Sequence, residues 1–179
     1  MNQERDKHST LQNRVGIIML VIICIWFASR LWSDPLLQVD TIAPVWKLPL
    51  ADGSGKMLRL EDLRGKAVVL DFWSTTCAPC RRQMEELDAI WRELEQKGAV
   101  IIGIAAGGED VSEIVEFKKN KRIPYPLVVD SGTAAHAYKV RSLPTLYVLD
   151  KQGKIAAAHG GLWDRRDIVR AVTSALAAP

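Results

Sequence analysis

Two apolar runs, the first broken only by Asp71, define the centre of the chain. Ala67–Trp73 and Ala99–Ala105 are dominated by aliphatic and β-branched residues, as in strands buried on both faces of a sheet. Between them lies an apolar stripe with helical spacing, formed by Met84, Leu87, Trp91 and Leu94. Strand, helix and strand within about forty residues predict a βαβ unit with parallel strands.

Shorter patterns surround this unit. A small hairpin and a helical turn are expected before it, and two helices, a short strand, a second hairpin and a last helix after it. This order predicts an α/β fold, with a central mixed β-sheet and helices on both faces. The expected elements are Val45–Leu50, Lys56–Leu60, Glu61–Arg64, Val111–Lys119, Leu127–Asp130, Ser131–Tyr138, Thr145–Leu149, Lys154–Ala158 and Arg165–Ala177.

A charge-free apolar run precedes the α/β pattern. It covers residues 15–28, and it extends to residue 32 if Arg30 snorkels to the interface. Because no pair of small residues marks a cleavage site, we predict an uncleaved transmembrane signal anchor over residues 15–32. A cleaved signal peptide and a buried core helix are the alternatives.

The charges beside this run predict its orientation. Arg5, Lys7 and Arg14 precede it, and positive flanks stay in the cytoplasm. We therefore expect a cytoplasmic flank (1–14), a linker (33–43) and a domain (44–179) outside the cytoplasm. The expected location is the bacterial inner membrane, crossed once, with the catalytic domain in the periplasm or extracytoplasmic space.

The net charge is only +3, and residues 1–33 carry four basic and two acidic side chains. The predicted domain is therefore close to neutral. A nucleic-acid-binding domain usually has a basic patch, so we expect no nucleic-acid partner.

The three cysteines point to chemistry more than to stability. Cys24 lies in the apolar run, which leaves Cys77 and Cys80 as the possible pair. A bridge across two residues closes a very short loop and restricts the unfolded chain little. A redox-active Cys77–Cys80 disulfide explains this spacing better, and it requires no other cofactor.

The position of the pair suits thiol exchange. The segment Cys77-Ala78-Pro79-Cys80 joins the first buried strand to the following helix, so Cys77 sits at the helix N-terminus, where the macrodipole favours a thiolate. Pro79 is tolerated in a first turn. We expect Cys77 to attack a substrate disulfide and the more buried Cys80 to resolve the mixed disulfide.

Other roles for the pair fit less well. A zinc site needs two more ligands, and His136 and His159 stand in no ligand motif. Haem attachment needs a histidine where Arg81 stands. A copper-binding module would use both thiolates but lacks a Met/His cluster, and the usual peroxidase pattern is absent around Cys77.

Two further residues are candidate catalytic groups. Burial of Asp71 would raise its pKa and suit it to exchange a proton with Cys80, unless it lies on a solvated edge strand. A cis peptide at Pro144 would leave the backbone of Leu143 free to pair with a substrate strand. A trans loop proline is the alternative that the residues alone favour.

From residue 43 onward the chain resembles the thioredoxin superfamily, and specifically its membrane-anchored TlpA/ResA-like branch. The motifs are APVWKLPLADGSGKMLRLEDLRGKAVVLDFW, CAPC, YPLVVD and AYKVRSLPTLYVLDKQGKI, together with the N-terminal apolar run. The resemblance implies a thioredoxin-like fold with a cis Pro144 facing the CxxC, Asp71 as the buried acid and Trp73 as an aromatic near the active site. Core packing alone is the alternative for Trp73.

The resemblance also implies partners and shows two departures. The expected function is reduction of disulfides in secreted proteins, and a dithiol oxidase is the alternative. The expected partners are protein thiols and disulfides, such as apocytochrome c thiols or a copper-site protein, and a membrane thiol donor. Where many relatives have a glutamate this chain has Gln83, and where they often have a tryptophan it has Thr76. Gln83 cannot titrate, and Thr76 alters substrate contacts. The expected substrate-binding residues are Trp73, Thr76, Ala78, Pro79 and Leu143.

Overall fold

A computed structural model describes residues 17–24, 26 and 36–178. The chain divides into two units, Met1–Pro35 and Leu36–Pro179. In the first unit, residues 17–24 and 26 are helical. Within the described residues, no helix is both long enough and apolar enough for a membrane crossing. The rest of the predicted anchor 15–32, the flank 1–14 and residues 33–35 of the linker lie outside the described residues.

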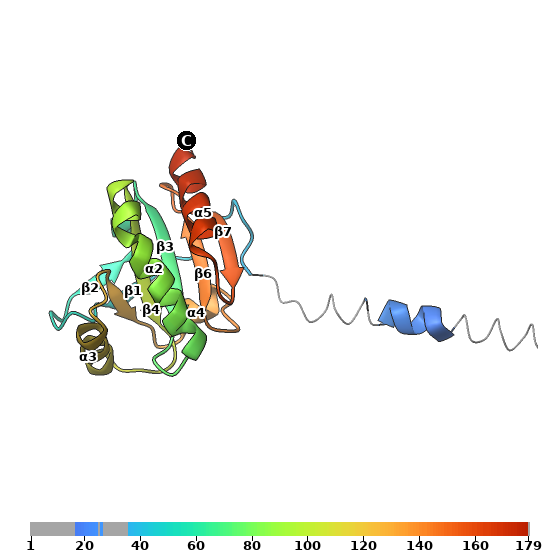
Figure 1. The fold of residues 1–179 in the computed structure, drawn as a ribbon, viewed down its shortest axis with the longest axis horizontal. Coiled ribbons are helices and arrows are strands. Elements are labelled where there is room, and N and C mark those ends of the chain that lie inside the picture. The colour runs from blue at the N-terminus through green and yellow to red at the C-terminus, as the bar shows by residue number, and fades with distance from the viewer. Residues whose placement is uncertain (1–16, 25, 27–35, 179) are drawn as a thin grey trace, which may run out of the picture. The chain divides into compact units, whose positions relative to one another are not determined.

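The second unit is built on one five-stranded sheet (Figure 1). Its strands have the spatial order β5-β4-β3-β6-β7, in which β3, β4 and β5 are parallel and β6 and β7 are antiparallel to their neighbours. The predicted mixed sheet is therefore confirmed. The elements are β1 (Lys47–Pro49), β2 (Met57–Arg59), the 3-10 turn η1 (Leu60–Leu63), β3 (Ala67–Trp73), α2 (Ala78–Gln96), β4 (Ala99–Ala105), α3 (Val111–Lys121), β5 (Leu127–Val129), α4 (Thr133–Ala137), β6 (Thr145–Leu149), β7 (Ile155–Gly160) and α5 (Arg165–Ala177).

The two central strands have the predicted bounds, because each is a continuous apolar run with a turn at both ends. Several outer elements differ by one to three residues. The helix α3 runs two residues beyond the prediction, from a capping box at Asp110 to Arg122, which has a left-handed backbone (φ 53°). The strands β1 and β2 form the expected hairpin but are shorter than predicted.

Side chains of β3 alternate between two hydrophobic cores. Val69 and Trp73 belong to the core under α2, α3 and α5, and Leu70 and Phe72 to the core under the β1–β2 hairpin and α4. Helices therefore cover both faces, as predicted. Asp71 shares the α2 face with Val69 and Trp73, and the first turn of α2 contributes to the same core.

Candidate active site

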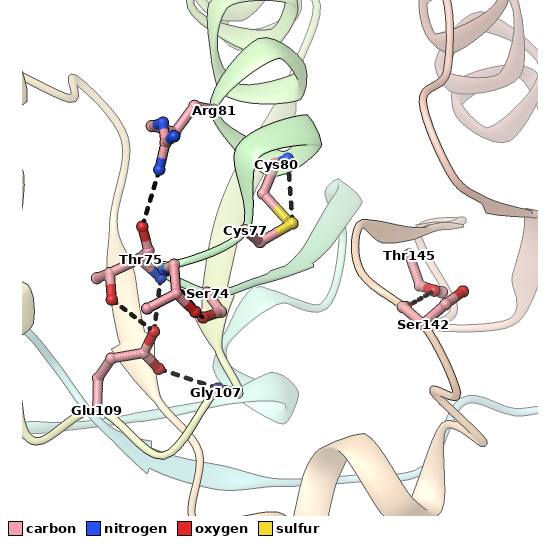
Figure 2. Close-up of a disulfide and its surroundings, with 10 residues drawn as sticks. Ser74, Thr75, Cys77, Cys80, Arg81, Gly107, Glu109, Ser142 and Thr145 are labelled. Atoms are coloured by element: carbon pink, nitrogen blue, oxygen red, sulfur yellow. Dashed lines mark hydrogen bonds between the residues drawn. A yellow bond between two sulfur atoms is a disulfide. The ribbon is translucent and has the colours of Figure 1, made fainter.

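Cys77 and Cys80 form a disulfide at the start of α2 (Figure 2). Cys77 is the N-cap residue, and the backbone N–H of Cys80 donates a hydrogen bond to Cys77 Sγ at 3.2 Å. The Cys77 side chain is half-buried, whereas Cys80 is completely buried. Both the placement of Cys77 at the helix N-terminus and the greater burial of Cys80 agree with the sequence prediction.

A tight turn leads from the sheet to Cys77. The backbone N–H of Cys77 donates to the carbonyl of Ser74 at 3.2 Å. The Ser74 hydroxyl accepts from the N–H of Thr76 at 3.3 Å and lies 3.0 Å from the Thr76 hydroxyl. This turn delivers the chain from the end of β3 to the helix, and it fixes the backbone just before the first cysteine.

Charged side chains hold Thr75, the second residue of this turn. Glu109 Oε1 accepts hydrogen bonds from the Thr75 backbone N–H at 2.6 Å and from its hydroxyl at 3.0 Å. Arg81 Nη1 donates to the Thr75 carbonyl at 3.1 Å. Arg81 therefore binds the turn backbone from the first turn of α2.

Asp71 is a buried acid without a partner. It lies on the central strand β3 and is 0% exposed, so the alternative of a solvated edge strand is wrong. Neither carboxylate oxygen has a hydrogen-bond partner among the described residues. Burial raises the pKa of Asp71 to about 8, because the charged form loses its hydration. The group can therefore gain or lose a proton near neutral pH.

Two more polar groups lie unpaired in the same core. Trp73 Nε1 and Tyr125 Oη have no partner within the described part of the chain. Trp73 is 0% exposed and its ring lies 4.9 Å from that of Phe117 on α3. The structure thus gives Trp73 a role in core packing, and its place among the substrate-binding residues stays a prediction.

The segment before β6 lies at the same end of the sheet as the cysteines. Thr145 pairs with Phe72 on β3, five residues before Cys77. The Leu143–Pro144 peptide is cis, as the family resemblance predicts and the residues alone did not. Leu143 is half-buried and packs against both cores, while Pro144 is buried and its carbonyl accepts from the N–H of Gly161 at 2.8 Å.

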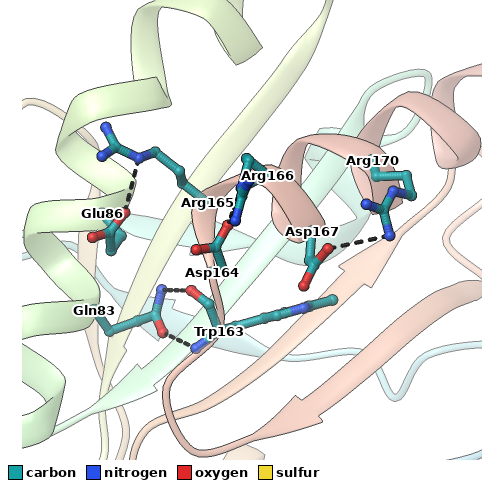
Figure 3. Close-up of polar contacts among 8 residues, drawn as sticks. All are labelled: Gln83, Glu86, Trp163, Asp164, Arg165, Arg166, Asp167 and Arg170. Atoms are coloured by element: carbon teal, nitrogen blue, oxygen red, sulfur yellow. Dashed lines mark hydrogen bonds and ion pairs between the residues drawn. The ribbon is translucent and has the colours of Figure 1, made fainter.

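Gln83 joins α2 to the segment before α5 (Figure 3). Its Oε1 accepts from the Trp163 N–H at 2.7 Å, and its Nε2 donates to the Trp163 carbonyl at 3.2 Å. The Gln83 side chain is completely buried. This two-way contact gives Gln83 a structural role that the sequence did not reveal.

Three small, uncharged residues are exposed beside the disulfide, and the exposed Arg81 and Arg82 follow Cys80. Thr76, Ala78 and Pro79 are all exposed around the half-buried Cys77. These are the residues that a partner protein would meet first. Within the described residues, no group of three or more His, Cys, Asp or Glu side chains is placed to hold a metal ion.

Sequence reasoning missed Glu109, Tyr125 and Trp163. Glu109 is one acid in a Gly-rich loop, 34 residues from the threonine that it binds. The signal available was the pair Gly107-Gly108 before it, which allows a loop to approach a neighbouring backbone closely. Tyr125 and Trp163 are large aromatic residues, and no motif in the sequence around them distinguishes them from core residues.

Known proteins resemble both the sequence and the fold. The thiol-disulfide oxidoreductase ResA of Bacillus cereus is 31% identical over 145 residues, which cover 78% of this chain and 82% of that protein. A thiol:disulfide interchange protein of the thioredoxin family from Chlorobium tepidum TLS superposes with a TM-score of 0.68 at 25% identity, covering 78% and 98% of the two chains. The exposed lipoprotein thioredoxin of Streptococcus pneumoniae strain TIGR4 gives a TM-score of 0.65 at 28% identity, covering 73% and 99%.

A thioredoxin-like sheet, a disulfide at a helix N-terminus and these relatives define a thiol–disulfide oxidoreductase. Residues 39–158 match the AhpC/TSA family. The chain belongs to that family, and it is similar in sequence to several thiol-disulfide oxidoreductases named ResA.

Proposed function

We propose that this protein reduces disulfides of secreted proteins, with Cys77 as the nucleophile and Cys80 as the resolving thiol. One observation carries the proposal. Cys77 is partly accessible at a helix N-cap, and Cys80 is fully buried one turn behind it. An N-terminal dipole and a donated N–H both favour the thiolate of Cys77.

The reaction takes two exchanges. The Cys77 thiolate attacks one sulfur of a substrate disulfide, forms a mixed disulfide and releases the other substrate sulfur as a thiolate. The Cys80 thiolate then attacks Cys77 Sγ, forms the Cys77–Cys80 disulfide and releases the second substrate thiolate. Two electrons pass to the substrate, and a membrane dithiol donor restores the reduced pair by the reverse sequence.

Asp71 supplies the proton chemistry of the second step. Cys80 is buried and must lose a proton before it attacks, and a thiol in apolar surroundings ionises reluctantly. The Asp71 carboxylate accepts this proton, and the protonated acid returns it when the disulfide is reduced. A pKa of about 8 suits both directions near neutral pH.

A partner would dock around the disulfide. Thr76, Ala78 and Pro79 form the exposed rim, and Leu143 with Pro144 lies at the same sheet end. We propose that an extended substrate segment pairs with the backbone of Leu143. The absence of charge from this rim fits a range of protein substrates, including apocytochrome c thiols and copper-site proteins.

The N-terminal segment would anchor the enzyme in the membrane. We propose a single-pass anchor over residues 15–32, with residues 1–14 in the cytoplasm and the oxidoreductase domain in the extracytoplasmic space. The support is the apolar run and its basic flank. Protease added to intact spheroplasts should digest the domain, and complete protection would refute this orientation.

The redox direction follows from the reduction potential. A value near −270 mV, about that of thioredoxin, fits a reductant, whereas a value near −120 mV fits a dithiol oxidase. Equilibration of the purified protein with glutathione or dithiothreitol buffers measures it. The outcome near −120 mV would reverse the proposed direction and leave the thiol chemistry in place.

Three cysteine variants test the mechanism. Cys80→Ser should trap substrate proteins on Cys77 as mixed disulfides, which reductant releases on a gel. Cys77→Ser should abolish exchange, while the matched control Cys24→Ser should behave as the wild type. Full turnover by Cys80→Ser would show that Cys80 is not the resolving thiol.

A further inference from the structure

The loop between β4 and α3 forms hydrogen bonds with the turn that leads to Cys77 (Figure 2). Glu109 Oε1 takes both donors of Thr75, at 2.6 Å and 3.0 Å, and Glu109 Oε2 accepts from the N–H of Gly107 at 2.9 Å. With Arg81 on the Thr75 carbonyl, all three polar groups of this threonine are held. An acid and a base from two different elements thus fix one residue of the turn.

The two loops also touch directly. A Cβ atom at Gly107 would lie 2.6 Å from Ser74 Cβ and would overlap the Ser74 hydroxyl. Only glycine permits this approach. The Gly107 backbone therefore packs against the Ser74 side chain while its N–H binds Glu109, and both residues belong to one contact that joins the α3 loop to the cysteine turn.

Glu109 holds the turn as an anion. Partial burial would raise the pKa of its carboxyl group, but the hydrogen bonds from Thr75 and Ser74 outweigh burial and leave the pKa below its ordinary value. Hydrogen bonds to a charged acceptor are shorter and stronger than neutral ones. The 2.6 Å contact with the Thr75 N–H is of this kind.

We propose that Glu109 is a positioning residue for the thiol exchange, which keeps the Ser74–Cys77 turn in the geometry that presents Cys77 Sγ to a substrate disulfide. The proposal rests on Cys77 being the nucleophile. Glu109 acts through Thr75 and touches neither cysteine in this role. Its loss frees the Thr75 N–H and hydroxyl, and the turn then samples arrangements in which Cys77 leaves the helix N-cap.

A pair of substitutions separates position from charge. Glu109→Gln and Glu109→Ala remove the same negative charge and the acceptor of the Gly107 N–H, but glutamine keeps an oxygen that accepts both Thr75 donors. In a reduced background that carries both Cys24→Ser and Cys80→Ser, so that Cys77 is the one remaining thiol, the rate of Cys77 reaction with 5,5′-dithiobis(2-nitrobenzoate) is measured against pH. This profile gives the thiol pKa and the limiting rate constant of the thiolate separately.

We expect Glu109→Ala to lower the limiting rate constant roughly tenfold and Glu109→Gln to stay within about threefold of the parent. Glu116→Ala, at an exposed acid on α3, removes the same charge as a matched control and should change nothing. Equal effects of alanine and glutamine at position 109 would overturn the positional role, as would no effect of either.

A second variant keeps the test decisive if Glu109→Ala fails to fold. Thr75→Val removes only the hydroxyl bond to Glu109, and it should slow the reaction about twofold to threefold without lowering the melting temperature. An unchanged rate would overturn the proposal. If Cys77 is unreactive in the parent protein itself, the proposed function fails first, so the two failures are distinguishable.

Discussion

Two buried aspartates of the same sheet have opposite surroundings. Asp130 follows β5 and is 2% exposed, and its carboxylate accepts from the N–H of Ala134 at 3.0 Å and of Ala135 at 2.8 Å. Asp71 lies in β3 and is 0% exposed, with no partner for either oxygen among the described residues. One acid caps α4, while the other is left unsatisfied beneath the cysteine helix.

We interpret this difference as one between an acid that stabilises the fold and an acid that transfers a proton in the mechanism that we propose. A carboxylate that accepts two backbone N–H groups regains part of the hydration that it lost on burial. A carboxylate without donors regains none, and folding then favours its protonated form. Asp71 therefore costs stability wherever it would be charged in the unfolded chain. An unpartnered acid of this kind in the core supports the proton-transfer role that we propose for Asp71.

The largest expected effect is on stability against pH. An unfolded aspartate ionises near pH 3.8, whereas folded Asp71 ionises near pH 8. Between these values the folded state holds the extra proton, so stability falls as pH rises from about 4 to about 8. Asp71→Asn removes this loss and should gain on the order of 5 kcal/mol above pH 8 and almost nothing at pH 3.

Urea unfolding of the detergent-solubilised, oxidised protein at several pH values measures this gain. Asp130→Asn serves as the control, because its carboxylate is hydrogen-bonded in the folded state. If the unfolding free energies of the wild type and Asp71→Asn change in parallel with pH, the folded protein does not hold an extra proton on Asp71, and the proposed contrast with Asp130 is wrong.

The second effect is on the resolving step. Without the Asp71 carboxylate, Cys80 must release its proton unaided, and we expect Asp71→Asn to slow resolution about a hundredfold at pH 7.5. Stopped-flow release of substrate thiol from a mixed disulfide preformed on Cys77 reports this step. The deficit should shrink as the pH rises, because hydroxide can then take the Cys80 proton in place of the carboxylate. An equal deficit at every pH would assign Asp71 another role.

The smallest effect concerns the capping acid. Asp130→Ala leaves two α4 N–H groups without an acceptor, and we expect a loss of about 2 kcal/mol of folding stability. The exchange rate of the folded fraction should stay at the wild-type value. Thermal unfolding and a thiol-exchange assay measure the two quantities. Impaired exchange at unchanged stability would mean that Asp130, too, serves the chemistry.

Local patterns were sufficient for much of the fold and for the cysteines. The apolar runs fixed β3 and β4 to the residue, and a cysteine pair between strand and helix located the N-cap. The position of Asp71 in an otherwise apolar strand favoured its burial, and only the strand order excluded a solvated edge strand. The cis Pro144 required the family resemblance, since its residues alone favour trans.

Contacts between distant segments were beyond such patterns. Glu109 and Thr75 meet across 34 residues, and Gln83 and Trp163 across 80. Each pair depends on how loops and helices pack after the sheet has formed, and neither residue type is unusual in its local sequence. The contact of the Trp73 ring with Phe117 on α3 is of the same kind, because it joins residues 44 positions apart.

The amide of Gln83 has a consequence of its own. A side-chain amide and a peptide group keep the same donors and acceptors in acid and in alkali. The junction between α2 and the segment leading into α5 therefore holds with equal strength as the surroundings acidify. In the extracytoplasmic location that we propose, the pH follows that of the medium. The two hydrogen bonds between Gln83 and Trp163 would then keep α2 in contact with the segment before α5 while nearby acidic groups gain or lose protons.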